Sequence, residues 1–408
     1  MTLAPAGLAA VAASLLDPAA ASDSVPLPVH AALLGSSMAA DRRWHLAFPG
    51  ATDLVYPDLA ALLTRQLLNN VGDPFDAGHG RNHTKTYEIQ TVRRLAGLFG
   101  ADPDTAWGYV ATGASEGTLH AINEAATSYP DVVVYASTAC HYSVAKAAAL
   151  VRAPLVLVRA DTHGRILLDE LRERLVEFRD RPAAIVATAG TTEQEGVDDV
   201  AGIASLCQDL RITRLRLHVD AALAGLPLAL LPTHERPGIG FDSGATSLVI
   251  SGHKFLSTLM PCAVILYPRR PDTLTAGHVS YIGSSDTTIT GSRSGHTPLL
   301  LHWALTGPGL DGHRRRADTA RELAAYTHDR LRHLGWSTHW QYPAFTITLA
   351  QPPRPLPRPW VLGGDRTTGR IICMPGTEQA WIDEFLTDLA PSASGARVPR
   401  QRRAGRPA

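Results

Sequence analysis

The segment Ser251-Gly252-His253-Lys254-Phe255 decides how the rest of the chain is interpreted. A strand-like run, residues 247–250, precedes it, and a second apolar run, residues 261–267, follows it. Burying a lysine ammonium between two such strands is costly, because the charge loses its hydration. A buried lysine therefore tends to lose its proton, and the neutral amine is the nucleophile that forms Schiff bases. An isolated loop lysine would extend to water instead, so the interpretation of Lys254 depends on the residues that precede it.

An aspartate at the end of an earlier strand supports a reactive lysine. Residues 215–222, Leu-Arg-Leu-His-Val-Asp-Ala-Ala, are typical of a strand that ends in Asp220 and is followed by two small residues. An acid at the carboxyl end of a strand in an α/β sheet points into the ligand crevice. A carboxylate beside a pyridine nitrogen keeps that nitrogen protonated, which is what pyridoxal phosphate needs to act as an electron sink. The spacing to Lys254 leaves room for a helix or loop and one further strand.

Together these segments resemble the pyridoxal-phosphate group II amino-acid decarboxylases, and within them the histidine and serine decarboxylase branch. The likeness runs from about Leu67 to Leu389, in the family's order: NNVGDPF, GYVATGASEG, HYSVAKAA, ATAGTT, HVDAALAG, SGHKF, MPCAVIL, DTTITGSRSGH and IICMPG. The chain departs from the family pattern at Ala263, where a glycine is typical, and at Gly113-Ala114-Ser115, where Gly-Gly-Thr is common. The resemblance implies an α/β, fold-type I (aspartate aminotransferase-like) enzyme. Its central sheet is expected to be mostly parallel, with helices on both faces and a small C-terminal α+β domain.

The resemblance also implies roles for individual residues. Lys254 is expected to hold pyridoxal 5'-phosphate through a Schiff base, Asp220 to stabilise its pyridinium, and His141 to stack on one face of its ring. Tyr281 is the nominee for the acid that protonates the substrate carbon after CO2 leaves. The other predicted cofactor contacts are Gly113, Ala114, Ser115, Thr191, Ala222, Ser251 and His253. Thr191 fits a plain strand-end turn equally well.

The segment Gly113-Ala114-Ser115-Glu116-Gly117 has two interpretations. It follows a predicted strand at residues 107–112 and opens a predicted helix at residues 118–126, so its N–H groups can hold a phosphate. It also matches the G-x-S-x-G nucleophile elbow of serine hydrolases, with Ser115 as the nucleophile. A hydrolase would leave the segments around Asp220 and Lys254 unexplained, so the phosphate interpretation is favoured.

Two further polar features invite functional interpretations. His79 and His83 have the H-x3-H spacing of a metal site on a helix, but Gly78 and Gly80 disfavour a helix there, so no metal is predicted. The long polar stretch 281–296 is typical of a functional lid or of a linker.

In the enzymes that the chain resembles, this polar stretch lies at the dimer interface and completes the neighbour's site. A homodimer with shared active sites is therefore predicted. Arg293, within the stretch, could clamp a carboxylate or phosphate, or form a salt bridge across the interface.

Composition places the chain among ordinary soluble enzymes. Of its 408 residues, 45% are hydrophobic and 19% are charged, and the formal net charge is zero. This balance favours neither nucleic acid nor an anionic membrane as a partner, and no apolar run reaches the length of a membrane span. The four cysteines are scattered without metal-ligand or disulfide spacing, so a cytoplasmic protein is predicted.

Four parts are expected along the chain: an N-terminal helical arm (1–66), a large cofactor-binding domain (67–305), a small C-terminal domain (306–390) and a disordered basic tail (391–408). The predicted reaction is decarboxylation of an L-amino acid to the corresponding amine and CO2, with histidine as the first candidate substrate and serine as the second. Aldehyde formation or transamination with the same cofactor remains an alternative, as does hydrolysis by Ser115.

Overall fold

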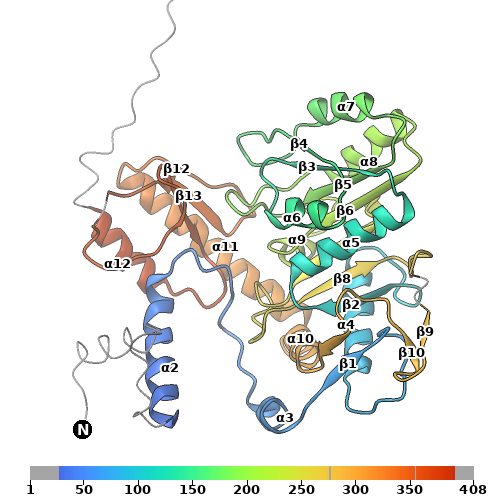
Figure 1. Ribbon diagram of the computed structural model, residues 1–408. Helices are drawn as coiled ribbons and strands as arrows, with labels where there is room; N and C mark the ends of the chain where they lie inside the picture. Colours follow the sequence, from blue (N-terminus) through green and yellow to red (C-terminus); the bar gives the residue numbers. More distant parts are fainter. Residues whose placement is uncertain (1–26, 275–276, 354, 391–408) are drawn as a thin grey trace, which may run out of the picture.

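The structure is a computed structural model that describes residues 27–274, 277–353 and 355–390 (Figure 1). The predicted basic tail and residues 1–26 of the predicted N-terminal arm lie outside these residues. Within the described part of the chain, no helix combines the length and the apolar character that a membrane crossing requires.

A seven-stranded sheet forms the centre of the larger body in Figure 1. Its strands are β2 (Trp107–Ala111), β3 (Val133–Ser137), β4 (Leu155–Val158), β5 (Ala183–Thr188), β6 (Leu215–Asp220), β7 (Ser247–Ser251) and β8 (Ala263–Tyr267). They lie in the order β2-β8-β7-β6-β5-β3-β4, and β8 pairs antiparallel with both of its neighbours while the other pairs are parallel. Most of these strands are buried throughout, as expected for apolar runs whose two faces are both covered. The mostly parallel sheet predicted from the sequence is confirmed.

Helices cover both faces of this sheet. They are α4 (Lys85–Leu98), α5 (Ala114–Ser128), α6 (Ser143–Leu150), α7 (Leu168–Glu177), α8 (Val200–Asp209), α9 (Gly225–Ala229) and α10 (His296–Thr306). Side chains alternate between the two faces along a strand, so Val134 of β3 packs with α5 and α6, whereas its neighbour Tyr135 packs in the cluster that contains α7 and α8.

A second, antiparallel sheet lies in the C-terminal part of the chain. Its strands are β12 (Thr338–His339), β13 (Thr346–Ala350), β14 (Gly363–Gly364) and β15 (Thr368–Ile372), in the order β12-β13-β15-β14. We call it the C-terminal sheet. The helices α11 (Gly309–His333) and α12 (Gln379–Leu389) pack with it around a separate core that includes Trp336, Ile347 and Phe385. The N-terminal helix α2 (Leu27–Trp44) ends against this core, where Trp44 meets Trp360 with ring centroids 4.8 Å apart.

Short elements lie beside the central sheet (Figure 1). After η1 (Pro57–Leu59) and α3 (Ala60–Arg65), the strand β1 (Asn69–Val71) pairs with β11 (Ser292–Ser294), and β9 (His278–Val279) pairs with β10 (Ser284–Ser285). The polar stretch 281–296 is therefore tied to the body by two short strands and is not a linker.

Candidate active site

The carboxyl ends of β3, β5, β6 and β7 meet at one edge of the central sheet, and a cavity of about 260 Å³ opens there. Thr188 and Asp220 are paired in register at the ends of β5 and β6, and Ser251 ends β7. Of the eleven residues predicted for the site, nine line this cavity: Gly113, Ala114, Ser115, His141, Asp220, Ala222, Ser251, His253 and Lys254. The structure thus brings together segments that are far apart in the sequence.

Lys254 and Asp220 form the charged pair of the cavity. Burial lowers the pKa of Lys254, the Asp220 carboxylate opposes that shift, and Arg370 adds to it. A lowered pKa increases the fraction of neutral amine, which is the nucleophilic form. Asp220 is itself buried, and its Oδ1 accepts a hydrogen bond of 3.2 Å from the backbone N–H of Ala222. This contact holds the carboxylate at the end of β6.

The hydrogen bonds of His141 define which of its ring nitrogens carries the proton. Its Nδ1 lies 2.8 Å from Ser143 Oγ and accepts a hydrogen bond of 3.3 Å from the Ser143 backbone N–H. Because a backbone N–H can only donate, Nδ1 is unprotonated and Nε2 carries the proton. Burial lowers the pKa of His141, so the ring is neutral near pH 7. The cavity therefore contains a neutral imidazole that can donate from Nε2.

Tyr142 also lines the cavity, and the sequence analysis missed it. Its ring packs against His141 with centroids 4.2 Å apart, yet 72% of the side chain is exposed. The only sequence signal was its position next to a nominated histidine.

The N-terminus of α5 faces the same cavity. The N–H groups of Glu116 and Gly117 bond to the Gly113 carbonyl, which leaves those of Ala114 and Ser115 without an acceptor within the helix. The buried Glu116 carboxylate holds the preceding turn by accepting hydrogen bonds from Thr112 N (2.8 Å) and Thr112 Oγ1 (2.6 Å). Free N–H groups at the positive end of a helix dipole bind anions.

Ser115 does not have the surroundings of a hydrolase nucleophile. It is an exposed second residue of α5 rather than the apex of a strained turn. The two histidines of the cavity direct Nδ1 elsewhere: His141 to Ser143, and His253 to the Cys262 backbone. Neither histidine therefore presents Nδ1 to a Ser115 nucleophile.

Two predicted residues lie away from the cavity. Thr191 is buried behind the cavity wall, where its Oγ1 accepts a hydrogen bond of 2.9 Å from Gly196 N. It is a turn residue, the alternative considered for it. Tyr281 lies between β9 and β10 with 84% of its side chain exposed, and it does not line the cavity. Within one chain, the structure does not bring Tyr281 to Lys254.

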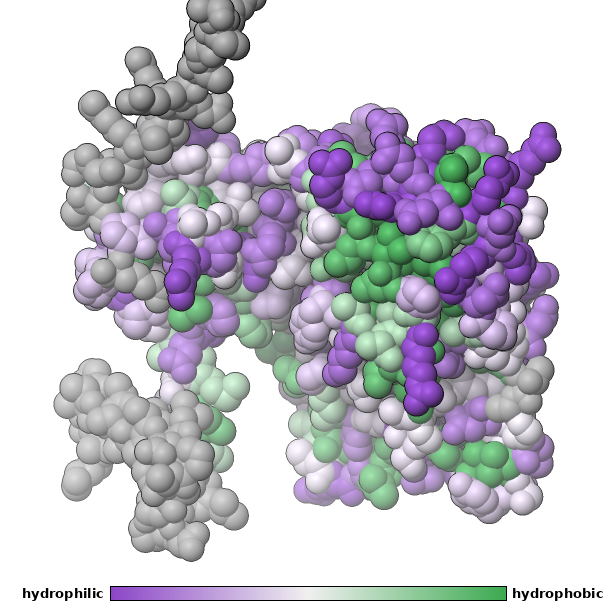
Figure 2. Space-filling model, turned by 45° about the horizontal axis from the view of Figure 1, so that its top comes forward, coloured by the Kyte–Doolittle hydropathy of each residue, from purple (hydrophilic) through white to green (hydrophobic). Residues whose placement is uncertain are grey.

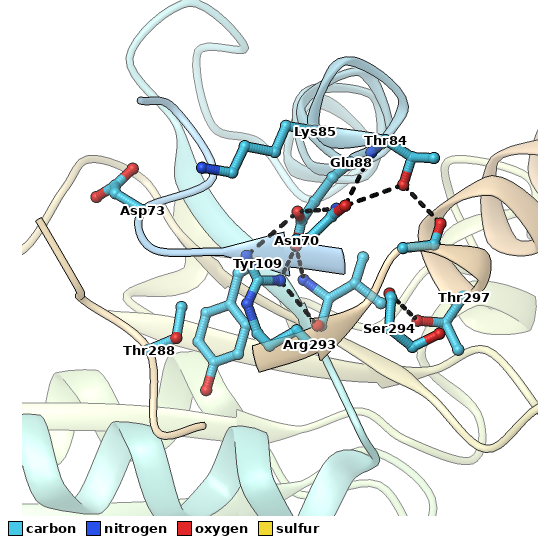
Figure 3. Close-up of polar contacts among 12 residues, drawn as sticks. Asn70, Asp73, Thr84, Lys85, Glu88, Tyr109, Thr288, Arg293, Ser294 and Thr297 are labelled. Atoms are coloured by element: carbon cyan, nitrogen blue, oxygen red, sulfur yellow. Dashed lines mark hydrogen bonds and ion pairs between the residues drawn. The ribbon is translucent and has the colours of Figure 1, made fainter. Parts of the chain in front are cut away.

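Arg293 belongs to a buried polar cluster, shown in Figure 3. Its Nη1 pairs with the Glu88 carboxylate and donates to the Val110 carbonyl at 3.2 Å, and its Nη2 donates to the Gly72 carbonyl at 3.3 Å. Asn70 Nδ2 donates to the same carboxylate at 2.8 Å. Both functions predicted for Arg293, a ligand clamp and an intersubunit salt bridge, are wrong, because both terminal nitrogens of the guanidinium bond within the chain.

The cavity residues fit pyridoxal phosphate. The hydroxyls of Ser251 and Thr188 are buried and find no hydrogen-bond partner in the described part of the chain, which is costly unless a ligand supplies one. A Cβ built on Gly113 would meet no atom within 4 Å, so the space beside the α5 N-terminus is open. An amine, a buried acid, a neutral imidazole and an anion site thus surround one space. Thr188 is a second lining residue that the sequence analysis missed, although it ends the apolar strand β5.

Known proteins with similar sequences and folds agree with this arrangement. Residues 89–336 match the family model of the pyridoxal-dependent decarboxylase conserved domain. A histidine decarboxylase of Mesorhizobium japonicum is 35% identical over 358 residues, which cover 88% of this chain and 96% of that protein. Serine decarboxylase 2 of Oryza sativa subsp. japonica is 30% identical over 350 residues, which cover 85% of this chain and 74% of that protein.

Solved structures share the fold. An L-methionine decarboxylase from Streptomyces sp. 590 superposes with a TM-score of 0.78 at 22% identity, over 90% of this chain and 95% of that one. With the family model covering more than half of the chain, the classification does not depend on the fold alone. The chain therefore belongs to the pyridoxal-dependent decarboxylases: its cofactor is pyridoxal phosphate, and it is a carboxy-lyase that acts on an amino acid.

Proposed function

We propose that the protein decarboxylates L-histidine to the corresponding amine and CO2. The main support for this reaction is one cavity that is lined by Lys254, Asp220, a neutral His141 and the N-terminus of α5. The choice of histidine is supported by the near full-length similarity to a histidine decarboxylase. Serine is the second candidate, since serine decarboxylases match at lower identity.

The residues of the cavity divide the work as follows. The Lys254 amine holds the cofactor covalently, and the α5 N-terminus, with Ser251 and His253, holds its phosphate. Asp220 keeps a proton on the pyridine nitrogen. When bound, pyridoxal phosphate supplies the electron sink that accepts the electrons left behind by CO2. His141 would lie on one face of the ring, where its Nε2–H would orient the carboxylate that leaves, and the small Ala222 would lie on the other face.

The substrate proposal is tested by comparing kcat/KM for histidine, serine, methionine, aspartate, valine and tyrosine. A site that hydrogen-bonds a polar substrate group rejects analogues without that group by about 10⁴-fold or more, so a large preference for histidine is expected. A higher kcat/KM for valine or tyrosine would contradict the substrate and leave the decarboxylase assignment intact. Equal rates of CO2 and amine release exclude aldehyde formation and transamination.

A homodimer with shared active sites is part of the proposal. Figure 2 shows a continuous apolar area on the body that holds the central sheet, a feature typical of an interaction surface. The exposed Tyr281 can serve as the acid that protonates the substrate carbon only if it reaches the site of a second subunit. Free thiols at all four cysteines support a reducing compartment, and we place the protein in the cytoplasm.

Subunit mixing tests the shared site. Lys254→Ala and Tyr281→Phe chains are each expected to be inactive, and a statistical mixture should regain about a quarter of the wild-type activity, because half of the dimers then contain one intact site. Native mass spectrometry of the mixture, which counts the mixed dimers, serves as the control for subunit exchange. No recovery in dimers shown to be mixed would contradict the role of Tyr281.

A further inference from the structure

The hairpin that follows β5 separates two cavities. On one side, Thr188, Gly190 and Thr192 line the cavity that contains Lys254. On the other side, residues 194–197 line a second cavity of about 240 Å³, which is closed by residues 341–344 of the C-terminal part of the chain. Ala189 and Thr191 of this hairpin are buried, whereas Glu195 borders the second cavity. On that side, polar contacts add to the packing that positions the hairpin.

Glu195, in this hairpin, adopts an unfavourable backbone conformation. Its φ is +56°, in the left-handed region, where glycine is favoured and a side chain adds a free-energy cost. Its N–H donates to the Thr191 carbonyl at 2.8 Å, which closes the turn, and only 6% of the residue is exposed. The left-handed backbone conformation and the burial of the carboxylate each cost free energy, so the hydrogen bonds of the Glu195 side chain must compensate for both.

These contacts reach the C-terminal sheet. Glu195 Oε2 accepts hydrogen bonds from Phe345 N at 3.0 Å and from Thr346 Oγ1 at 2.6 Å, where β13 begins. From β15, Arg370 Nη1 donates to the Thr192 carbonyl at 2.6 Å, on the same hairpin. Both links involve a group that can carry a charge, the Glu195 carboxyl and the Arg370 guanidinium, and a hydrogen bond to an ionised group is roughly twice as strong as a neutral one.

We propose that Glu195 is a positioning residue, whose carboxylate fastens the cofactor-lining hairpin to β13 so that the cavity takes its cofactor-binding shape only when the C-terminal sheet is docked. The link joins β13 of the C-terminal sheet to the hairpin after β5. Thr188, Gly190 and Thr192 of that segment line the cavity at the edge of the central sheet. The proposal rests on the family's cofactor and not on the choice of histidine as substrate.

The test is the dissociation constant of pyridoxal phosphate, measured by absorbance on the apoprotein without substrate. The Glu195→Gly variant should bind the cofactor about tenfold more weakly, the factor that one hydrogen bond to a charged group represents. Glycine suits the positive φ, so this variant removes the link without straining the turn. Glu195→Gln keeps an acceptor oxygen and should stay within about threefold of the wild type.

Arg211→Gly is the matched control. Arg211 also has a φ of +56°, but it is exposed in the turn after α8. This variant should leave the cofactor affinity unchanged, and thermal unfolding of each apoprotein shows whether it is folded.

Thr346→Val should weaken cofactor binding in the wild-type background and have no further effect in the Glu195→Gly background, because both changes break one link. Unchanged affinity in Glu195→Gly would overturn the proposal. So would a loss in Glu195→Gln as large as that in Glu195→Gly, or additive effects of the Thr346 and Glu195 changes.

Discussion

The Lys254 cavity and the Arg293 cluster are both groups of charged and polar side chains beside the central sheet, but they differ in how their atoms are paired. In the cavity, the Ser251 and Thr188 hydroxyls are buried without a partner in the described residues. In the cluster, the Glu88 carboxylate takes hydrogen bonds from Arg293, Asn70 and the Val110 N–H (Figure 3). Arg293 Nε is also buried without a partner among the described residues, but the unpaired hydroxyls of Ser251 and Thr188 differ from it because they line a cavity that a ligand can fill.

Two lysines provide the largest test of this comparison. The chain contains three lysines, of which Lys254 lines the cavity and Lys85 adjoins the cluster, donating to the Asp76 carbonyl at 2.5 Å. Lys254→Ala should reduce kcat by about a thousandfold or more, because the nucleophile is lost. It should also abolish covalent trapping of the cofactor by borohydride, measured by peptide mapping. The control Lys85→Met should keep the trapped cofactor on Lys254, and trapping on any other residue would contradict the assignment.

Breaking the Arg293 pair should mainly affect folding. Arg293→Met leaves the buried Glu88 carboxylate without its counter-charge, and the free energy of unfolding of the apoprotein should fall by about 3–5 kcal/mol. The double variant Arg293→Met/Glu88→Gln removes that isolated charge and should recover part of the loss. Urea unfolding curves of the three proteins measure these differences. If Arg293→Met lost activity but kept its stability, Arg293 would have a role in the active site and not in folding.

The buried Glu195 should make stability depend on pH. Burial raises the pKa of Glu195 to about 7 from its usual value of 4.5, against the opposing hydrogen bonds from Thr346 and Phe345. Between these two values the folded state binds more protons than the unfolded state. The contribution of Glu195 to stability therefore falls as pH rises through this window, by about 3 kcal/mol in all.

Glu195→Gln removes this titration. The melting temperature of the apo variant, relative to wild type, should therefore rise between pH 5 and 7.5. Arg321, Lys254 and Cys373, the other titratable groups coupled to Glu195, are the same in both proteins, so their titration largely cancels in the difference. A difference that stays flat over this range would show that Glu195 does not titrate there.

Removing the unpaired Ser251 hydroxyl should give the smallest effect. It should weaken cofactor binding but increase the stability of the apoprotein. Ser251→Ala should weaken cofactor binding by about tenfold, since a hydrogen bond to an anion is lost. It should also stabilise the apoprotein by about 1 kcal/mol, because a buried unsatisfied hydroxyl is removed. Ser115→Ala is the matched control: its backbone N–H remains, so both quantities should change little. Destabilisation of the Ser251→Ala apoprotein would mean that the hydroxyl is already paired without the cofactor.

Patterns that are local in the chain determined much of this protein from the sequence alone. Segments that match the family's motifs predicted a mostly parallel sheet, and parallel strands present their carboxyl ends at one edge. Asp220 could therefore be placed in the crevice as an acid at a strand end, the resemblance to the family added Ser251 and Lys254, and all three line the same cavity. The same reasoning located the N-terminus of α5 as an anion site.

Only the tertiary structure decided which residues near those strands face the cavity and which partners they have. Thr188 and Thr191 are alike in sequence, but the turn after β5 directs Thr188 into the cavity and ties Thr191 to Gly196. Arg293 in β11 and Glu88 in α4 are 205 positions apart, and only the folding of the chain places α4 beside β11. Burial and strand direction follow from short-range patterns, whereas the partner of a charged side chain depends on which distant segments the fold places beside it.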